Sequence, residues 1–104
     1  MKKIINGKLY DTEVAKEVGS INYSTFLAEQ RLFFLNADIY LKTNGEWFLC
    51  GKGNCIYPYD VDSPYGEVPG GYIIYPLKID EAKLLIEKFM DAEVYIQYFG
   101  VVEE

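Results

Sequence analysis

The 104-residue sequence contains no histidine and only two cysteines, and its 10 basic residues are outnumbered by 16 acidic ones. Without histidine, one chain cannot form a catalytic triad with an imidazole base or a His-ligated metal site. The shortage of lysine and arginine argues against direct nucleic-acid binding, because a phosphate backbone needs a basic face. No hydrophobic run approaches the roughly 20 residues that span a bilayer. We therefore expect a cytoplasmic protein that contacts neither membrane nor nucleic acid directly.

Apolar and aromatic residues are plentiful. Half of the chain is hydrophobic and 16% is aromatic, with ten tyrosines and six phenylalanines. Disordered chains are poor in such residues. Two domains of half this length would each be too small to bury an adequate core. The composition therefore predicts one folded domain over residues 1–104.

The first ten residues predict a strand, a turn and a returning strand. Lys2–Ile5 is the first strand, and Asn6-Gly7 is a strong turn dipeptide. Residues 8–10 are positioned to return as the partner strand.

A short N-terminal helix is predicted next. Asp11 and Thr12 offer N-cap oxygens for a helix over residues 13–18. Glu13 would lie in its first turn, where the helix dipole favours a negative charge. Gly19 is a natural C-terminal stop.

The strongest local signal is a second hairpin in the middle of the chain. Residues 38–43 and 46–51 flank Asn44-Gly45, the pair preferred in type I′ turns because both central residues need positive φ. A two-residue loop pairs Tyr40 with Leu49, and side chains alternate between the two faces. The face predicted to be core carries Ile39, Leu41, Phe48 and Cys50. The other face is amphipathic and could be covered by the helices or remain partly exposed; it carries Tyr40, Lys42, Trp47 and Leu49.

Two further strands and two helices complete the prediction. Residues 31–35 read as another strand, or as an upstream extension of the hairpin that bends near Asn36. Tyr72–Leu77 reads as the last strand, with Pro76 placing its end at a sheet edge. Residues 80–89 form an amphipathic helix, and Asp91 can cap a last helix that ends before Gly100. The predicted class is α+β: a small antiparallel sheet centred on the hairpin, a short N-terminal helix, and two C-terminal helices packed on one face. The apolar stripe expected to make that contact is Ala82, Leu85, Ile86 and Phe89.

Two interpretations of Cys50 and Cys55 are open. They could be half of a zinc site completed by Asp60 or Asp62, or they could be thiols, with Cys50 in the core. A closed zinc site needs four ligands, and the sequence lacks the missing Cys or His. We therefore expect free thiols and no metal or cofactor. The serines have no base to activate them, so we predict no catalytic residues.

Two regions are candidates for binding a protein partner. Residues 51–71 form a long segment rich in glycine, proline and tyrosine, and such loops often carry function. Residues 80–104 hold seven acidic and two basic residues and can face a basic partner. The alternatives are that the rings pin the loop onto its own sheet and that the acids form a solvated helix face. The candidate partner-binding residues are Tyr57, Tyr59, Tyr65, Trp47, Glu87, Asp91 and Glu93.

Four collinear segments carry a family resemblance. Residues 2–13 read KKIINGKLYDTE and residues 40–49 read YLKTNGEWFL. The third segment is Pro76-Leu77 together with DEAK at residues 80–83. The fourth is the C-terminal end, which contains DAEVY, FG and EE. Together these segments resemble small acidic proteins of Firmicutes phages, plasmids and integrative elements.

Some proteins of this appearance inhibit type II CRISPR effector nucleases. The resemblance therefore implies a non-enzymatic anti-CRISPR role, in which the chain binds such a nuclease in the cytoplasm of a bacterial host cell. It carries no catalytic motif. Val94, Ile96, Tyr98 and Val101 stand where the family has acids, which favours an apolar contact with a target protein or a homodimer. The alternative is an interaction module of a mobile genetic element, either a monomer or a homodimer, that is unrelated to CRISPR.

Overall fold

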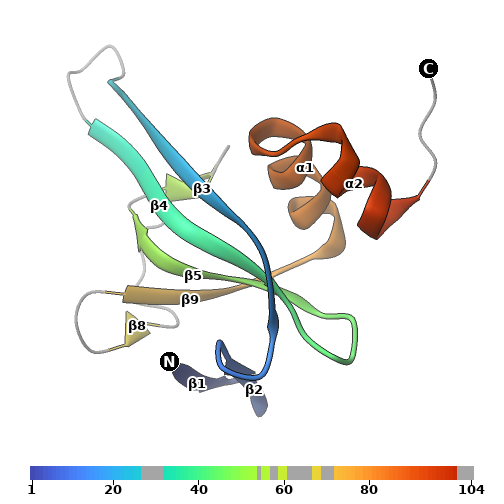
Figure 1. The fold of residues 1–104 in the computed structure, drawn as a ribbon. Coiled ribbons are helices and arrows are strands. Elements are labelled where there is room, and N and C mark those ends of the chain that lie inside the picture. The colour runs from blue at the N-terminus through green and yellow to red at the C-terminus, as the bar shows by residue number, and fades with distance from the viewer. Residues whose placement is uncertain (27–31, 54, 57–58, 61–66, 69–71, 101–104) are drawn as a thin grey trace.

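The computed structural model describes residues 1–26, 32–53, 55–56, 59–60, 67–68 and 72–100. Its centre is a five-stranded antiparallel sheet with the strand order β3-β4-β5-β9-β8 (Figure 1). In that order, the strands are Lys16–Phe26, Leu32–Leu41, Trp47–Gly53, Tyr72–Leu77 and Glu67–Val68.

Two short hairpins and two helices accompany this sheet. β1 pairs with β2, and β6 pairs with β7. The four short strands are Lys2–Ile5, Lys8–Asp11, Cys55–Ile56 and Tyr59–Asp60. The helices α1 (Ile79–Phe89) and α2 (Ala92–Phe99) follow the last strand.

Both helices pack on one face of the sheet (Figure 1). The apolar stripe predicted for α1 is confirmed: Ala82, Leu85 and Ile86 are fully buried and Phe89 packs at the margin of the core. Burying such a stripe is what stabilises a helix of this length, which is marginal alone. The sheet residues in this core are Ile21, Leu35, Ala37, Ile39, Trp47, Leu49 and Leu77.

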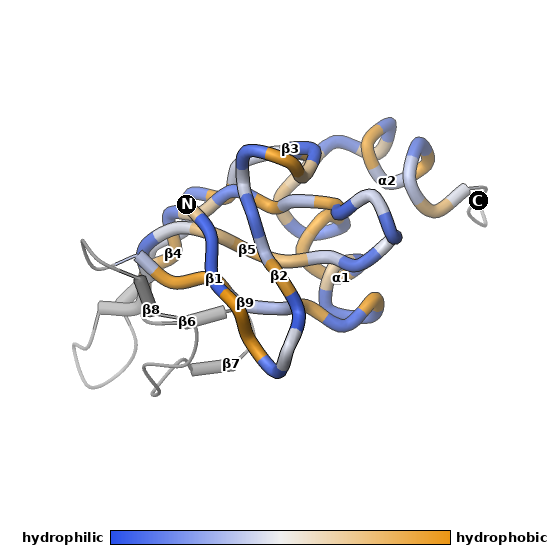
Figure 2. The backbone as a smooth tube through the Cα atoms, turned by 90° about the horizontal axis from the view of Figure 1, so that it is seen from below, coloured by the Kyte–Doolittle hydropathy of each residue, from blue (hydrophilic) through white to orange (hydrophobic). Residues whose placement is uncertain are grey.

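The β1–β2 hairpin covers the opposite face of the sheet. Figure 2 shows it lying across β9 and β5. Its inward side chains, Ile5 and Tyr10, form a second core with Phe48, Cys50 and Ile74. The Tyr10 ring meets the Phe48 ring edge to face at 5.4 Å. The fold therefore has three layers, with the sheet between the helices and the hairpin.

The prediction of an N-terminal helix was wrong. After β2 the chain makes a turn, in which the N–H groups of Val14 and Ala15 donate to the Asp11 carbonyl oxygen, and then enters β3. β3 and β4 pair over nearly their whole lengths. A six-residue helix is marginal alone, and pairing with β4 offers far more backbone hydrogen bonds. The class is α+β, but strands dominate and the sheet is larger than predicted.

The predicted hairpin register was also wrong, by one residue. The Lys42 N–H donates to the Glu46 carbonyl oxygen at 2.8 Å, so the loop has three residues, and Tyr40 pairs with Phe48. In this loop only Gly45 has a positive φ, at 91°. In the turn between β1 and β2, by contrast, both Asn6 and Gly7 have a positive φ. A one-residue shift moves every side chain of one strand to the other face. Trp47 and Leu49 therefore join the helix-side core, while Phe48 and Cys50 face the β1–β2 hairpin.

The C-terminal predictions were confirmed. β9 spans Tyr72–Leu77, and Asp91 and Gly100 flank α2 as its caps, with Gly100 at φ 88°. The backbone N–H of Lys78 donates to the Glu81 carboxylate at 2.8 Å, which satisfies one of the free donors at the start of α1. Of the strand predicted over residues 31–35, residues 32–35 form the first part of β4, which continues without interruption to Leu41, and Arg31 lies outside the described residues.

Candidate functional site

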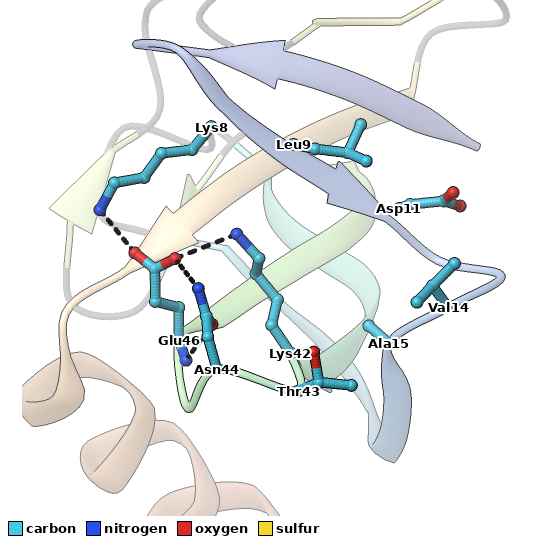
Figure 3. Close-up of a pocket in the computed structure, with 9 residues that line it drawn as sticks. All are labelled: Lys8, Leu9, Asp11, Val14, Ala15, Lys42, Thr43, Asn44 and Glu46. Atoms are coloured by element: carbon cyan, nitrogen blue, oxygen red, sulfur yellow. Dashed lines mark hydrogen bonds and ion pairs between the residues drawn. The ribbon is translucent and has the colours of Figure 1, made fainter.

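A cavity of about 640 Å³ lies between the β1–β2 hairpin and the loop after β4 (Figure 3). Leu9, Val14 and Ala15 form an apolar wall. Lys8, Lys42 and Glu46 form a charged one. Val14 is 69% exposed, so much of this wall is open to solvent.

Glu46 is the centre of the charged wall. Its carboxylate lies 2.6 Å from Lys8 Nζ and 3.0 Å from Lys42 Nζ (Figure 3). It also accepts from Asn44 Nδ2 at 2.7 Å. Hydrogen bonds from Lys8, Asn44 and Lys42 lower the pKa of Glu46 to about 2. A carboxylate so fully engaged is ionised near neutral pH and is a poor general acid or base.

Lys42 is held from two sides. Besides Glu46, its ammonium lies 4.3 Å from the centroid of the Tyr10 ring. The cluster therefore joins the β1–β2 hairpin to the loop between β4 and β5. We interpret it as a structural contact at the edge of the cavity.

A second cavity, of about 370 Å³, lies between α1 and α2. Its apolar lining includes Tyr95 and Ile96, and Ile96 is 47% exposed. Glu87 and Asp91, two of the predicted partner-binding residues, also line it. The third predicted acid, Glu93, is exposed in the first turn of α2. The structure therefore places two of the predicted residues, Glu87 and Asp91, around one apolar surface, and Glu93 is not among the residues that line it.

A further pair of acidic residues lies on β3 and β4, on the face away from the helices. Ser20 Oγ donates to Asp38 Oδ1 at 2.7 Å. The negative charge of Asp38 raises the pKa of Glu17, because two nearby carboxylates resist double ionisation. Sequence reasoning missed this pair because it placed Glu17 in a helix. The alternation of polar and apolar residues from Ser20 to Ser24 was the signal that predicts a strand there.

Trp47 does not lie on the surface, as a partner-binding residue would. The amphipathic face could be covered by the helices or stay partly exposed, and at Trp47 the helices cover it. Trp47 is 5% exposed, and its ring contacts those of Tyr98 and Phe99 at 5.6 and 5.3 Å. The register shift accounts for this, because it turns Trp47 toward the helices. Tyr57 and Tyr65 lie outside the described residues, and of Tyr59 only the backbone, in β7, is described.

Cys50 is a buried thiol in the core under the β1–β2 hairpin. Burial raises its pKa, and its Sγ lies 3.7 Å from Met1 Sδ. Within the described part of the chain, no three His, Cys, Asp or Glu residues are grouped so that they could hold a metal ion. The same residues include no helix long and apolar enough to cross a membrane.

A comparison with family models, curated proteins and solved structures found no match for this chain.

Proposed function

We propose that this chain is a non-enzymatic inhibitor that works in the bacterial cytoplasm by binding a protein with a basic surface, and that its target is a type II CRISPR-Cas effector nuclease. The cavity between α1 and α2 is the observation that supports this binding surface. It combines an apolar lining with the carboxylates of Glu87 and Asp91.

This combination suits a protein partner. Protein interfaces have an apolar centre surrounded by polar residues, and Ile96 and Tyr95 provide such a centre here. The chain has a formal net charge of -6, which accelerates encounters with a basic surface and discourages acidic partners.

The choice of target rests on the resemblance of four collinear segments to small acidic phage and mobile-element proteins. It fits the charge, because a nuclease that holds nucleic acid carries basic grooves. Occupying such a groove, or the surface beside it, requires no catalytic residues in the inhibitor.

The proposal is tested by titrating a panel of type II nucleases with the chain, and measuring both binding and DNA cleavage. We expect inhibition to be complete at about one chain per nuclease. Inhibition at far lower ratios would indicate an enzyme, and no binding across the panel would reject the target.

A matched pair of variants tests the surface. Ile96→Glu should weaken binding at least tenfold, because it places a charge in the apolar centre. Ile79→Glu changes an isoleucine that is 56% exposed at the start of α1, outside the cavity lining, and should leave binding within twofold. Equal effects of the two variants would reject this surface.

A second candidate function is a homodimeric interaction module of a mobile element. It is favoured by the exposed apolar pair on the outer face of the β1–β2 hairpin, where Ile4 lies opposite Leu9. Light scattering should then give twice the mass of the chain, and Leu9→Lys should give the monomer. A wild-type monomer at all concentrations would exclude this function.

A further inference from the structure

β3 is an edge strand of the central sheet (Figure 1). It has eleven residues and pairs with β4 on one side. None of the described residues pairs with its other side. An edge of this kind carries backbone donors and acceptors that can pair with another strand.

The register identifies which residues of β3 present these groups. In an antiparallel pair, alternate residues bond to the neighbouring strand. The bond from Lys42 N–H to the Glu46 oxygen shows that the backbone groups of Lys42 point to β5. Because this direction alternates along β4, the backbone groups of Ile39 and Ala37 point to β3. Their partners on β3 bond back to β4. The intervening residues, Ser20, Asn22 and Ser24, therefore direct their N–H and C=O groups to the free edge.

Pro76 supports this alternation independently. By the same alternation, the backbone groups of Phe48 bond to β4 and not to β9. Its partner on β9, Pro76, therefore lies at a position that makes no backbone hydrogen bond to β5. Proline has no N–H to donate and is tolerated only at such positions.

Within the described part of the chain, the free edge of β3 lacks the usual protection beyond its first residues. Sheet edges are commonly blocked by charged residues, proline or a bulge. The bulge of β3 lies between Glu17 and Gly19, at its beginning. From Val18 to Phe26 the strand contains no charged residue and no proline. Ser20, Asn22 and Ser24 are all exposed.

The two sides of this edge differ in chemistry. On the face away from the helices, Glu17 and Asp38 form a carboxylate pair for which no cation is recorded among the described residues. On the helix face, the end of the Met90 side chain lies against Gly19, and Tyr23 packs on Phe89. One side of an added strand would therefore meet carboxylates, and the other would meet apolar side chains.

We propose that the free edge of β3 binds an extended segment of a partner protein by strand addition, and that this segment alternates basic with apolar residues. Its backbone bonds to Ser20, Asn22 and Ser24. Its basic side chains lie toward Glu17 and Asp38, and its apolar ones lie toward Met90. Because Met90 also lines the cavity between α1 and α2, the two surfaces are neighbours. This mode of binding does not depend on the partner being a nuclease.

The test uses a fluorescein-labelled peptide of four Lys-Val repeats, with its binding followed by fluorescence anisotropy at 150 mM salt. We expect saturable binding, and at least tenfold weaker binding by a peptide of four Glu-Val repeats. No binding of the Lys-Val peptide would overturn the proposal, whatever the outcome with the nucleases.

Two protein variants distinguish strand addition from simple charge attraction. Asn22→Pro removes one outward N–H but no bond to β4, and should weaken binding at least tenfold. Asn22→Ala keeps that N–H and should remain within twofold of wild type. Glu17→Gln combined with Asp38→Asn should weaken binding about fivefold. Equal binding by the Pro and Ala variants would overturn the proposal.

Two N-methylated peptides keep the test decisive if Asn22→Pro fails to fold. One carries methyl groups on the lysine amides and the other on the valine amides. Because only alternate amides face β3, one of them should lose binding and the other should keep it. Equal effects of the two patterns would overturn the proposal. So would a wild-type dimer that Asn22→Pro dissociates, because the edge would then be occupied by a second copy.

Discussion

Lys42 and Glu46 contact each other twice. The backbone N–H of Lys42 donates to the Glu46 carbonyl oxygen at 2.8 Å, and Lys42 Nζ lies 3.0 Å from Glu46 Oε1. Lys8, from β2, reaches the other carboxylate oxygen. One carboxylate thereby connects the loop after β4 to the N-terminal hairpin, and its titration should affect the stability of both.

The first prediction concerns acid stability. The folded pKa of Glu46 is about 2, below its ordinary value of 4.5. A group with a lowered folded pKa contributes stability above its unfolded pKa and loses it as the pH falls to the folded value. Wild type should therefore lose more stability than Glu46→Gln between about pH 4.5 and 2, as measured by the urea midpoint. Glu13→Gln, at an exposed position, is the control. If wild type and Glu46→Gln follow parallel curves, the contact is not stabilising.

The second prediction concerns two glycines of the sheet. A Cβ on Gly51 would overlap the backbone oxygen of Asn36, whereas one on Gly19 would meet the flexible end of Met90 at 2.7 Å. Gly51→Ala should cost about 1–3 kcal/mol or more, since overpacking against backbone cannot relax easily. Gly19→Ala should cost clearly less, because a methionine end can move. Equal losses in chemical denaturation would contradict this reasoning.

The third prediction concerns Trp47. Its ring is buried between the sheet and the rings of Tyr98 and Phe99. Trp47→Ala should lower the free energy of unfolding by about 3–5 kcal/mol, in the range for large core truncations. Leu84→Ala, at a more exposed position on α1, should change it by only about 0.5 kcal/mol. A small loss for Trp47→Ala would mean that α2 does not rely on this contact.

The fourth prediction concerns charge at the α1–α2 cavity. Glu87→Lys should slow association with the nuclease identified by titration, and the deficit should shrink as salt is added. Glu13→Lys makes the same charge change at an exposed position outside the cavity and is the control. Stopped-flow association rates at several ionic strengths provide the measurement. Equal effects of both variants would mean that only the net charge matters.

Strong local signals predicted the C-terminal half of the fold. Tyr72–Leu77 is bounded by Gly71 and by the helix that follows, and the stripe from Ala82 to Phe89 has a clear helical period. Such periodicity reports which side of an element is buried, and it needs no knowledge of the rest of the chain. Asp91 and Gly100 likewise identify the limits of α2 from the chemistry of helix ends.

The hairpin register was not predictable from the turn dipeptide alone. Asn6-Gly7 adopts positive φ at both residues, whereas at Asn44-Gly45 only the glycine does. In the second turn, Asn44 bonds to the N–H and the carboxylate of Glu46, which suits a three-residue loop. The three-residue loop also places Trp47 against the helices. The same Asn-Gly dipeptide thus forms different turns at the two positions because the cores on either side of the sheet differ.

The candidate site was predicted in part. Glu87, Asp91 and Glu93 were identified from the acidity of the C-terminal region, and the structure places Glu87 on α1, Glu93 on α2 and Asp91 at the N-cap of α2. The edge of β3 was missed because N-cap and stop signals around residues 11–19 suggested a helix. Capping residues indicate only where a helix could begin and end. Here Lys16–Phe26 forms a strand because it pairs with the long strand β4.

The position of Cys50 links its thiol to the stability of one part of the fold. The β1–β2 hairpin covers this thiol and is joined to the sheet by the turn after Asp11. The sheet is built largely from strands that neighbour one another in sequence, so it can persist when the hairpin separates from it. In a Cys55→Ser background, the alkylation rate of Cys50 therefore measures how often the hairpin opens while the sheet remains folded.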